Sequence, residues 1–107
     1  MPTLYEIAVD APLPGTLTYA QPGDRDEFLA PGRVVLVPLG RRKVTGYVLG
    51  PAPPPEVDGA AFTVRPIADV LTAAPFFPAS LVPFYRWIAR YYHHPIGEVI
   101  HTALPSA

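Results

Sequence analysis

The first two thirds of the chain contain short runs in which apolar residues occupy every second position or every position, as they do in β-strands. Residues 5–9 place Ile7 and Val9 on one face, and residues 16–20 form a second short run after a proline-rich turn. Residues 34–37 are a continuous run of valine and leucine. Such a run is typical of a strand that is covered on both faces or curled into a small barrel.

Two further strands are predicted on either side of a proline-rich segment. Residues 44–49 follow the 34–37 run closely, so the two predict a hairpin whose tip is residues 39–43. Gly46 within the second arm indicates a bulge or a bend. Residues 64–71 predict the last strand. The intervening loop, residues 50–59, is stiffened by its prolines and fits either a surface excursion between strands or a PxxP ligand.

The last third of the chain changes to a helical period. Apolar residues recur there at spacings of three and four, namely Leu81, Phe84, Tyr85, Ile88, Tyr91 and Tyr92. Ser80 is the expected N-cap, Pro83 is tolerated in the first turn, and Pro95 ends the helix. A second short helix is expected at about residues 98–103, with Val99, Ile100 and Leu104 on one face.

These elements predict a mainly β protein with C-terminal helices, an α+β fold. We expect a small, curved β-barrel or sheet, loosely like the oligonucleotide-binding folds, followed by a helical pair. At 107 residues the chain is one domain, residues 1–107, with the proline-rich loop internal to it. It shows no membrane-spanning run, no secretory leader and no cysteine, which together predict a soluble, cytoplasmic protein.

Charge is distributed unevenly although the formal net charge is only −1. The segment from Phe28 to Pro55 has four basic residues and no acidic one: Arg33, Arg41, Arg42 and Lys43. A protein that binds nucleic acid through its backbone charge normally has a broad basic face. This chain predicts a single basic patch and therefore a small footprint on any nucleic acid.

Catalytic and metal-binding patterns are absent from the sequence. The three histidines, His93, His94 and His101, are the only candidate metal ligands, and adjacent histidines on a helix point about 100° apart. Histidines near a helix C-terminus instead cap the helix or complement its dipole. Carboxylates do not cluster, and no phosphate-binding glycine loop is present. We therefore expect no metal, no catalytic residue and no cofactor in this domain.

Several motifs, in order along the chain, resemble the N-terminal domain of the PriA family (primosomal protein N′). The most specific is Tyr91-Tyr92-His93-His94-Pro95-Ile96-Gly97-Glu98-Val99, followed by Ala103-Leu104-Pro105. Val37-Pro38-Leu39-Gly40 resembles the family's Val-Pro-Phe-Gly, and Leu13-Pro14 with Thr16-Leu17-Thr18-Tyr19 resembles its Leu-Pro…Thr-Phe-Asp-Tyr. Arg65 stands where the family has a basic residue before a Val-rich strand. The resemblance covers essentially the whole chain.

The resemblance implies a domain that binds the 3′-hydroxyl end of a DNA strand at stalled or abandoned replication forks and so orients the replication-restart protein. The rest of the family's polypeptide is a superfamily 2 DNA helicase, ATP-dependent and 3′-5′, that uses ATP and zinc. Implied partners are replication-fork DNA, primosome proteins and the helicase portion of the parent chain, with a nucleoid association. The helicase portion is expected to begin where this chain stops, so we interpret the chain as an isolated, non-catalytic domain.

The family's end-binding pocket transfers to four positions of this sequence: Leu17, Thr18, Gly40 and Arg65. Glycine lets the backbone approach a nucleotide closely, and an arginine keeps the family's positive charge and can stack on a base. Thr18 replaces an aspartate and keeps an oxygen for the terminal hydroxyl, while Leu17 replaces an aromatic residue. Arg41, Arg42 and Lys43 are expected to hold the DNA backbone.

Other interpretations of the same residues stay open. Gly40 fits an ordinary turn glycine, and Arg41, Arg42 and Lys43 fit a solvated hairpin tip. Trp87, Tyr91 and Tyr92 have the helical spacing of packing residues, with base stacking as the alternative. The alternatives for the whole domain are a general single-stranded nucleic-acid module that ignores ends, and a protein-interaction domain that docks helicase or primosome components.

Overall fold

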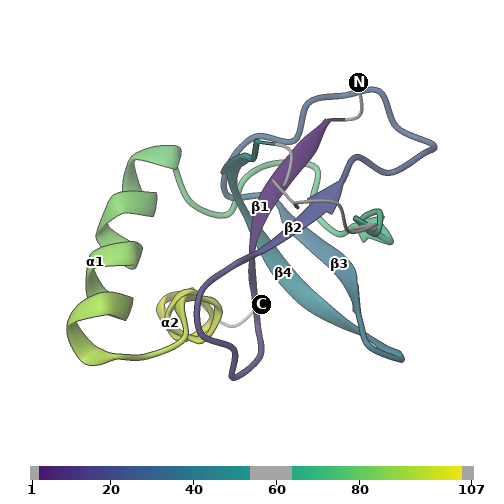
Figure 1. Ribbon diagram of the computed structural model, residues 1–107. Coiled ribbons are helices and arrows are strands. Elements are labelled where there is room, and N and C mark those ends of the chain that lie inside the picture. Colours follow the sequence, from purple (N-terminus) through teal and green to yellow (C-terminus); the bar gives the residue numbers. More distant parts are fainter. Residues whose placement is uncertain (1–2, 54–63, 105–107) are drawn as a thin grey trace.

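The computed structural model describes residues 3–53 and 64–104. Its five-stranded sheet has the order β2-β1-β4-β3-β5 with every neighbouring pair antiparallel, and two helices follow at the C-terminal end (Figure 1). This confirms the predicted α+β class. The elements are β1 (Leu4–Val9), β2 (Leu17–Ala20), β3 (Val34–Leu39), β4 (Arg42–Pro51), β5 (Asp69–Val70), a 3₁₀ turn η1 (Ala79–Leu81), α1 (Val82–Tyr92) and α2 (Ile96–Ala103).

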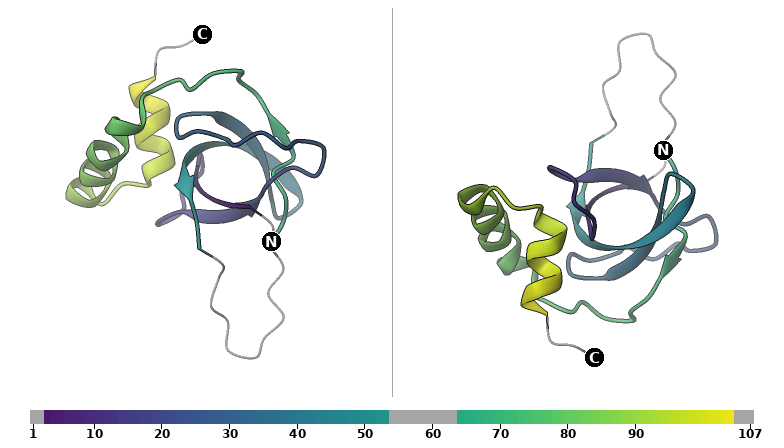
Figure 2. Two further views of the ribbon diagram at one scale, coloured as in Figure 1. Left: turned by 90° about the horizontal axis from the view of Figure 1, so that it is seen from above. Right: turned by 90° about the horizontal axis from the view of Figure 1, so that it is seen from below.

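The sheet curls around one core until its two edges nearly meet. Figure 2 shows the strands arranged as a ring, whose interior holds fully buried side chains such as Tyr5, Ile7 and Val35. The Ala20 amide donates to the Arg65 carbonyl at 3.0 Å, and the Ile67 amide donates to the Ala20 carbonyl at 3.0 Å. Strands β2 and β5 form no ladder with each other, so the sheet is not a closed barrel.

Gly46 allows β1 and β4 to curl tightly against each other. A Cβ at this position would lie 2.5 Å from Cγ2 of Ile7. The register shift of this strand pair falls between Glu6 and Ile7, where Leu49 is the extra residue of β4. The bulge or bend that the sequence predicted at Gly46 is therefore not found there. Gly46 instead makes a close contact with Ile7, and the bulge lies at Leu49, farther along β4.

The β3–β4 hairpin is tighter than the sequence indicated. Both strands extend toward the tip until Leu39 pairs with Arg42, so the connection is only Gly40-Arg41. Gly40 has a φ of 62°, and no positive φ occurs at Arg41. A positive φ at the first loop position alone is the pattern of a type II′ turn, which favours glycine there.

The strand predicted at residues 64–71 is mostly irregular. Only Asp69 and Val70 pair with β3, while Pro66 forms an isolated parallel bridge with Ala20. Proline has no amide to donate, so a proline within this run limits regular pairing. The predicted loop 50–59 also begins later than expected, because Gly50 and Pro51 still belong to β4. Its residues 54–59, like Pro105, lie outside the described residues.

Helix α2 packs on the outer face of the sheet and α1 packs mainly on α2, so that α2 lies between α1 and the sheet (Figure 2) and a second core forms. Ile96 and Ile100 of α2 are buried against Ala8 and Tyr47, and α1 contributes Val82 and Tyr85. Pro83 lies in the first turn of α1 as expected, but Ser80 does not cap the helix, because the 3₁₀ turn precedes it and Leu81 is the N-cap. No helix among the described residues is long and apolar enough to span a membrane.

The burial of α1 differs from the prediction. Its buried side is narrow, and the aromatic residues expected to pack are instead exposed: Phe84 (52%), Trp87 (56%), Tyr91 (63%) and Tyr92 (66%). Apolar residues surround more than half of this helix, so their spacing alone did not show which of them are buried.

Gly97 sets how closely α2 approaches the sheet. A Cβ here would lie 1.8 Å from the Val9 carbonyl oxygen and 2.4 Å from the Val9 carbonyl carbon. Real contacts of that kind are never so short, and backbone atoms cannot rotate away as a side chain can. The Pro-Ile-Gly part of the histidine motif therefore places α2 directly on the end of β1.

An ion pair connects β1 to α1. Arg86 donates to Glu6 through Nη1 (3.0 Å to Oε2) and Nη2 (2.6 Å to Oε1), and the Thr16 hydroxyl donates to the same carboxylate at 2.7 Å. The hydrogen bond from Arg86 lowers the pKa of Glu6, with a smaller lowering from Thr16, against the opposing effect of burial. The bidentate geometry fixes the orientation of α1 relative to the sheet.

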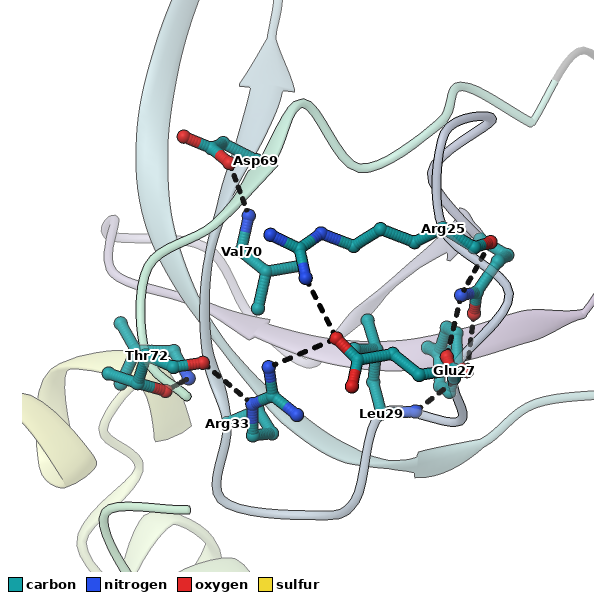
Figure 3. Close-up of polar contacts among 10 residues, drawn as sticks. Arg25, Glu27, Leu29, Arg33, Asp69, Val70 and Thr72 are labelled. Atoms are coloured by element: carbon teal, nitrogen blue, oxygen red, sulfur yellow. Dashed lines mark hydrogen bonds and ion pairs between the residues drawn. The ribbon is translucent and has the colours of Figure 1, made fainter. Parts of the chain in front are cut away.

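A polar network holds the connection between β2 and β3 (Figure 3). Arg33, predicted as part of the basic patch, is only 6% exposed. Its Nε donates to the Thr72 carbonyl at 2.8 Å, and its guanidinium lies 3.6 Å from Glu27, which also pairs with Arg25 at 2.7 Å. Arg33 therefore stabilises the fold and does not belong to an exposed basic surface.

We predict that Gly97→Ala destabilises the domain by about 2 kcal/mol, because the overpacking at Val9 exceeds the better helix propensity of alanine. Gly23→Ala is the matched control, since a Cβ at Gly23 meets nothing within 4 Å. Urea unfolding followed by circular dichroism measures both variants. Equal stability of the two would show that α2 can move away from β1 without cost.

A second prediction concerns acid stability. Because the folded-state pKa of Glu6 lies below its ordinary value of 4.5, the pair stabilises the fold above that pH and the contribution is lost as pH falls through the folded-state pKa. Because both side chains of the Glu6–Arg86 pair are partly exposed, the pair contributes only about 0.5–1 kcal/mol to the free energy of unfolding. Unfolding free energies measured between pH 3 and pH 6 should therefore depend less on pH in Glu6→Gln than in the unmodified chain. Parallel curves for the two proteins would contradict this assignment.

Candidate nucleic-acid interface

Arg65 joins the end of β2 to the tip of the β3–β4 hairpin. Its backbone carbonyl accepts from the Ala20 amide at 3.0 Å, and its Nη1 donates to the Gly40 carbonyl at 3.1 Å. The structure thus brings together two of the four predicted pocket residues, although they are 25 positions apart in the sequence.

Tyr19 holds β2 against the same hairpin. Its hydroxyl donates to the Pro38 carbonyl at 2.6 Å. Burial raises the pKa of Tyr19, and the positive charge of Arg65 lowers it by a smaller amount. The hydroxyl therefore stays protonated at neutral pH and keeps donating to Pro38. This bond fixes β2 next to the hairpin tip, where Arg65 also lies.

Leu17 and Thr18 present their side chains to opposite faces of the sheet. Leu17 pairs with Ile7, a core residue, and Thr18 pairs with Glu6, whose side chain reaches α1 on the outer face. Successive side chains of a strand alternate between faces. Leu17 is 37% exposed, so it lies on the core side of β2 but remains accessible to solvent. The Thr18 hydroxyl does not share that face.

Gly40 and the basic residues after it form an exposed tip. A Cβ at Gly40 would meet nothing within 4 Å, so the positive φ, and not crowding, explains the glycine in the unbound protein. Arg41, Arg42 and Lys43 are all exposed and make no ion pair with the described residues. Strand alternation directs Arg42 and Lys43 to opposite faces, so the three charges surround the tip and do not form one flat patch.

A groove was not predicted from the sequence. A cavity of about 550 Å³ lies between the β1–β2 connection and the C-terminal end of α1. Its lining includes Pro12 and Thr16 on one side and Arg90, His93 and His94 on the other. None of the four predicted pocket residues lines this cavity or the two smaller ones of about 350 and 260 Å³. Both walls contain residues of the family motifs, namely Pro14 and Thr16 on one side and the histidine motif on the other, but no short segment of sequence shows that the two meet.

The histidines have separate structural partners. His93 is the C-cap of α1 with a φ of 51°, and its amide donates to the carbonyls of the preceding turn. His94 lies 3.5 Å from Glu98, and Nδ1 of His101 lies 3.1 Å from Asp10. Within residues 3–53 and 64–104, no three side chains of metal-binding type come together.

Comparisons with known proteins identify the family. Residues 6–105 match the PriA 3′DNA-binding domain (3′BD). The chain is 28% identical over 103 residues to a protein named replication restart protein PriA of Treponema pallidum (strain Nichols), with 94% of this chain covered. It is 28% identical to the protein of the same name of Chlamydia trachomatis, with 94% covered, and 31% identical to that of Haemophilus influenzae, with 95% covered.

The chain spans only a small part of these relatives, 16%, 14% and 13% of their lengths respectively. The similarity therefore concerns one domain and not the activity of the whole relatives. Within that domain it is continuous, since the family match runs from β1 through both helices. On this match the chain belongs to the family of PriA 3′ DNA-binding domains.

Proposed function

We propose that this domain binds the free 3′-hydroxyl end of a DNA strand at stalled or abandoned replication forks and thereby orients a replication-restart protein. The proposal rests on the membership of the PriA 3′ DNA-binding family and on the hydrogen bond between Arg65 and Gly40. That bond places a cation at an exposed, glycine-containing tip beside the end of β2. DNA, primosome proteins and the helicase portion of the parent chain are the proposed partners, and the domain itself carries no catalysis.

The chemistry of the tip suits a terminal nucleotide. The Arg65 guanidinium has five N–H donors, of which one is engaged by Gly40, so others remain for a sugar oxygen, a base edge or a phosphate. Leu17 supplies an accessible apolar surface on the core side of β2. Thr18 belongs to the outer face, so we propose that its backbone, and not its hydroxyl, contributes to the end contact. Arg41, Arg42 and Lys43 then hold the phosphates that lead to the end.

A general single-stranded nucleic-acid module is the second candidate. The four exposed aromatic side chains of α1 favour it, because aromatic rings bind bases by stacking without regard to strand ends. The two candidates differ in whether the end matters, and end-modified strands distinguish them.

We predict that a short single strand with a 3′-hydroxyl binds at least about tenfold more tightly than the same strand with a 3′-phosphate, which corresponds to about 1.4 kcal/mol. An added phosphate brings bulk and charge to the position of the terminal sugar. A 5′-phosphate should change affinity little. Fluorescence anisotropy with labelled strands measures all three, and equal affinities would support the end-blind module.

A further prediction separates the end contact from the backbone contacts. Arg65→Ala should abolish the discrimination between hydroxyl and phosphate ends, because this variant lacks the side chain that we propose contacts the terminal nucleotide. The double variant Arg41→Ala/Arg42→Ala should weaken both ligands alike and make the salt dependence of binding shallower, by about 0.7 in slope for each phosphate that is no longer neutralised. These side chains are exposed, so circular dichroism should show unchanged folds. Intact end discrimination in Arg65→Ala would refute the role of this residue.

A further inference from the structure

The outer face of α1 carries an aromatic surface that no element of the described chain covers. Phe84, Trp87 and Tyr91 are more than half exposed, and they recur at spacings of three and four along one side of the helix. The rings of Trp87 and Tyr91 stack on each other, with centroids 5.2 Å apart and planes at 21°. Two stacked, accessible rings present a flat π surface, whereas residues that fill a core are enclosed on all sides.

The charge around this aromatic surface is positive. The α1 sequence has two arginines and no acidic residue. Arg86 is neutralised by Glu6, but Arg90 is exposed and makes no ion pair within the described part of the chain. Arg90 follows Trp87 by three residues, so the two are neighbours on the helix surface. It also lines the 550 Å³ groove, and therefore lies between the aromatic surface and the groove.

The groove has the composition of a site for phosphates. Among the described residues that line it, none carries a carboxylate, whereas Arg86, Arg90, His93 and His94 all belong to its lining. The acidic groups that pair with these side chains are Glu6, held by Arg86, and Glu98, 3.5 Å from His94. An apolar protein segment would leave Arg90 without a partner, whereas a nucleic-acid strand satisfies both the rings and the charge.

We propose that the outer face of α1 and the adjoining groove form a second DNA-binding surface, at which single-stranded DNA stacks bases on Trp87 and Tyr91 and places its phosphates at Arg90. Figure 1 shows α1 and the β3–β4 hairpin on opposite sides of the molecule, so this surface is separate from the proposed end site. It binds interior nucleotides and needs no free end. The inference goes beyond the proposed function and does not depend on end recognition.

The single tryptophan of the chain makes the proposal directly measurable, since all tryptophan emission comes from Trp87. The probe is an oligothymidylate of about 12 nucleotides, within the usual site sizes for single strands. It is added to the 107-residue chain with either a 3′-hydroxyl or a 3′-phosphate, and its total binding is followed in parallel by anisotropy. Base stacking should quench Trp87 with both strands, including the end-blocked one.

Variants test the individual contacts. Tyr91→Ala should weaken binding of the 3′-phosphate strand about tenfold, as expected when one base no longer stacks. Phe28→Ala is the matched control, because Phe28 is 59% exposed and lies on the β2–β3 connection, and it should leave the affinity unchanged. Arg90→Glu should reduce affinity by tenfold or more, and Arg90→Lys should restore most of it. Circular dichroism should confirm the fold of each variant, since these side chains are exposed.

The outcomes separate this proposal from the end-binding function. Quenching by both strands with equal affinities would reject end recognition and retain the α1 surface. Saturated binding by anisotropy without any change in Trp87 emission, together with unchanged affinity of Tyr91→Ala, would overturn the α1 proposal and leave a protein-docking role for this face. Absence of binding to either strand would reject both.

Discussion

The arrangement of the whole C-terminal third depends on how closely one helix can approach the sheet. Gly97 places the start of α2 against the backbone of Val9, at a separation that leaves no room even for a methyl group. The buried isoleucines of α2 then fix its rotation, and the left-handed His93 turns the chain back so that α1 lies beside it. The Glu6–Arg86 pair fixes the other end of this arrangement on β1. The groove exists because these contacts hold α1 near the β1–β2 connection.

Local sequence patterns predicted the positions of the strands and helices better than they predicted which of these elements pack or pair with each other. The alternating and continuous apolar runs located β1 to β4 because each run is bounded by glycine or proline, and the helical period located both helices. The pairing of β1 with β4 and the curling of the sheet depend on contacts between distant residues, such as Gly46 with Ile7, which no short window contains. The same limit applies to Arg33, whose burial results from Thr72, 39 residues later.

The candidate end-binding site stays a prediction, and the sequence indicated only part of its geometry for a similar reason. The family motifs located Arg65 and Gly40, and the structure joins them by a hydrogen bond. They did not indicate that strand alternation separates the side chains of Leu17 and Thr18, since that follows from the pairing register with β1. Hydrophobic spacing also assigned the α1 aromatic residues to packing, because spacing is identical for a covered and an uncovered apolar face. The tertiary structure shows that Val82 and Tyr85 join the buried cluster that α2 shares with the sheet, whereas Trp87 is left in solvent.

The near-meeting of the sheet edges has a consequence for the behaviour of the protein in concentrated solution. An open sheet presents a row of unpaired amides and carbonyls along each edge, and such rows pair with other chains and begin aggregation. Here the Ala20 amide and carbonyl at one edge are occupied by Arg65 and Ile67 from the segment leading to the other edge. The segment before β5 thus shields the end of the β2 edge at Ala20. At this position the edge cannot pair with another chain, although the sheet does not close into a complete barrel.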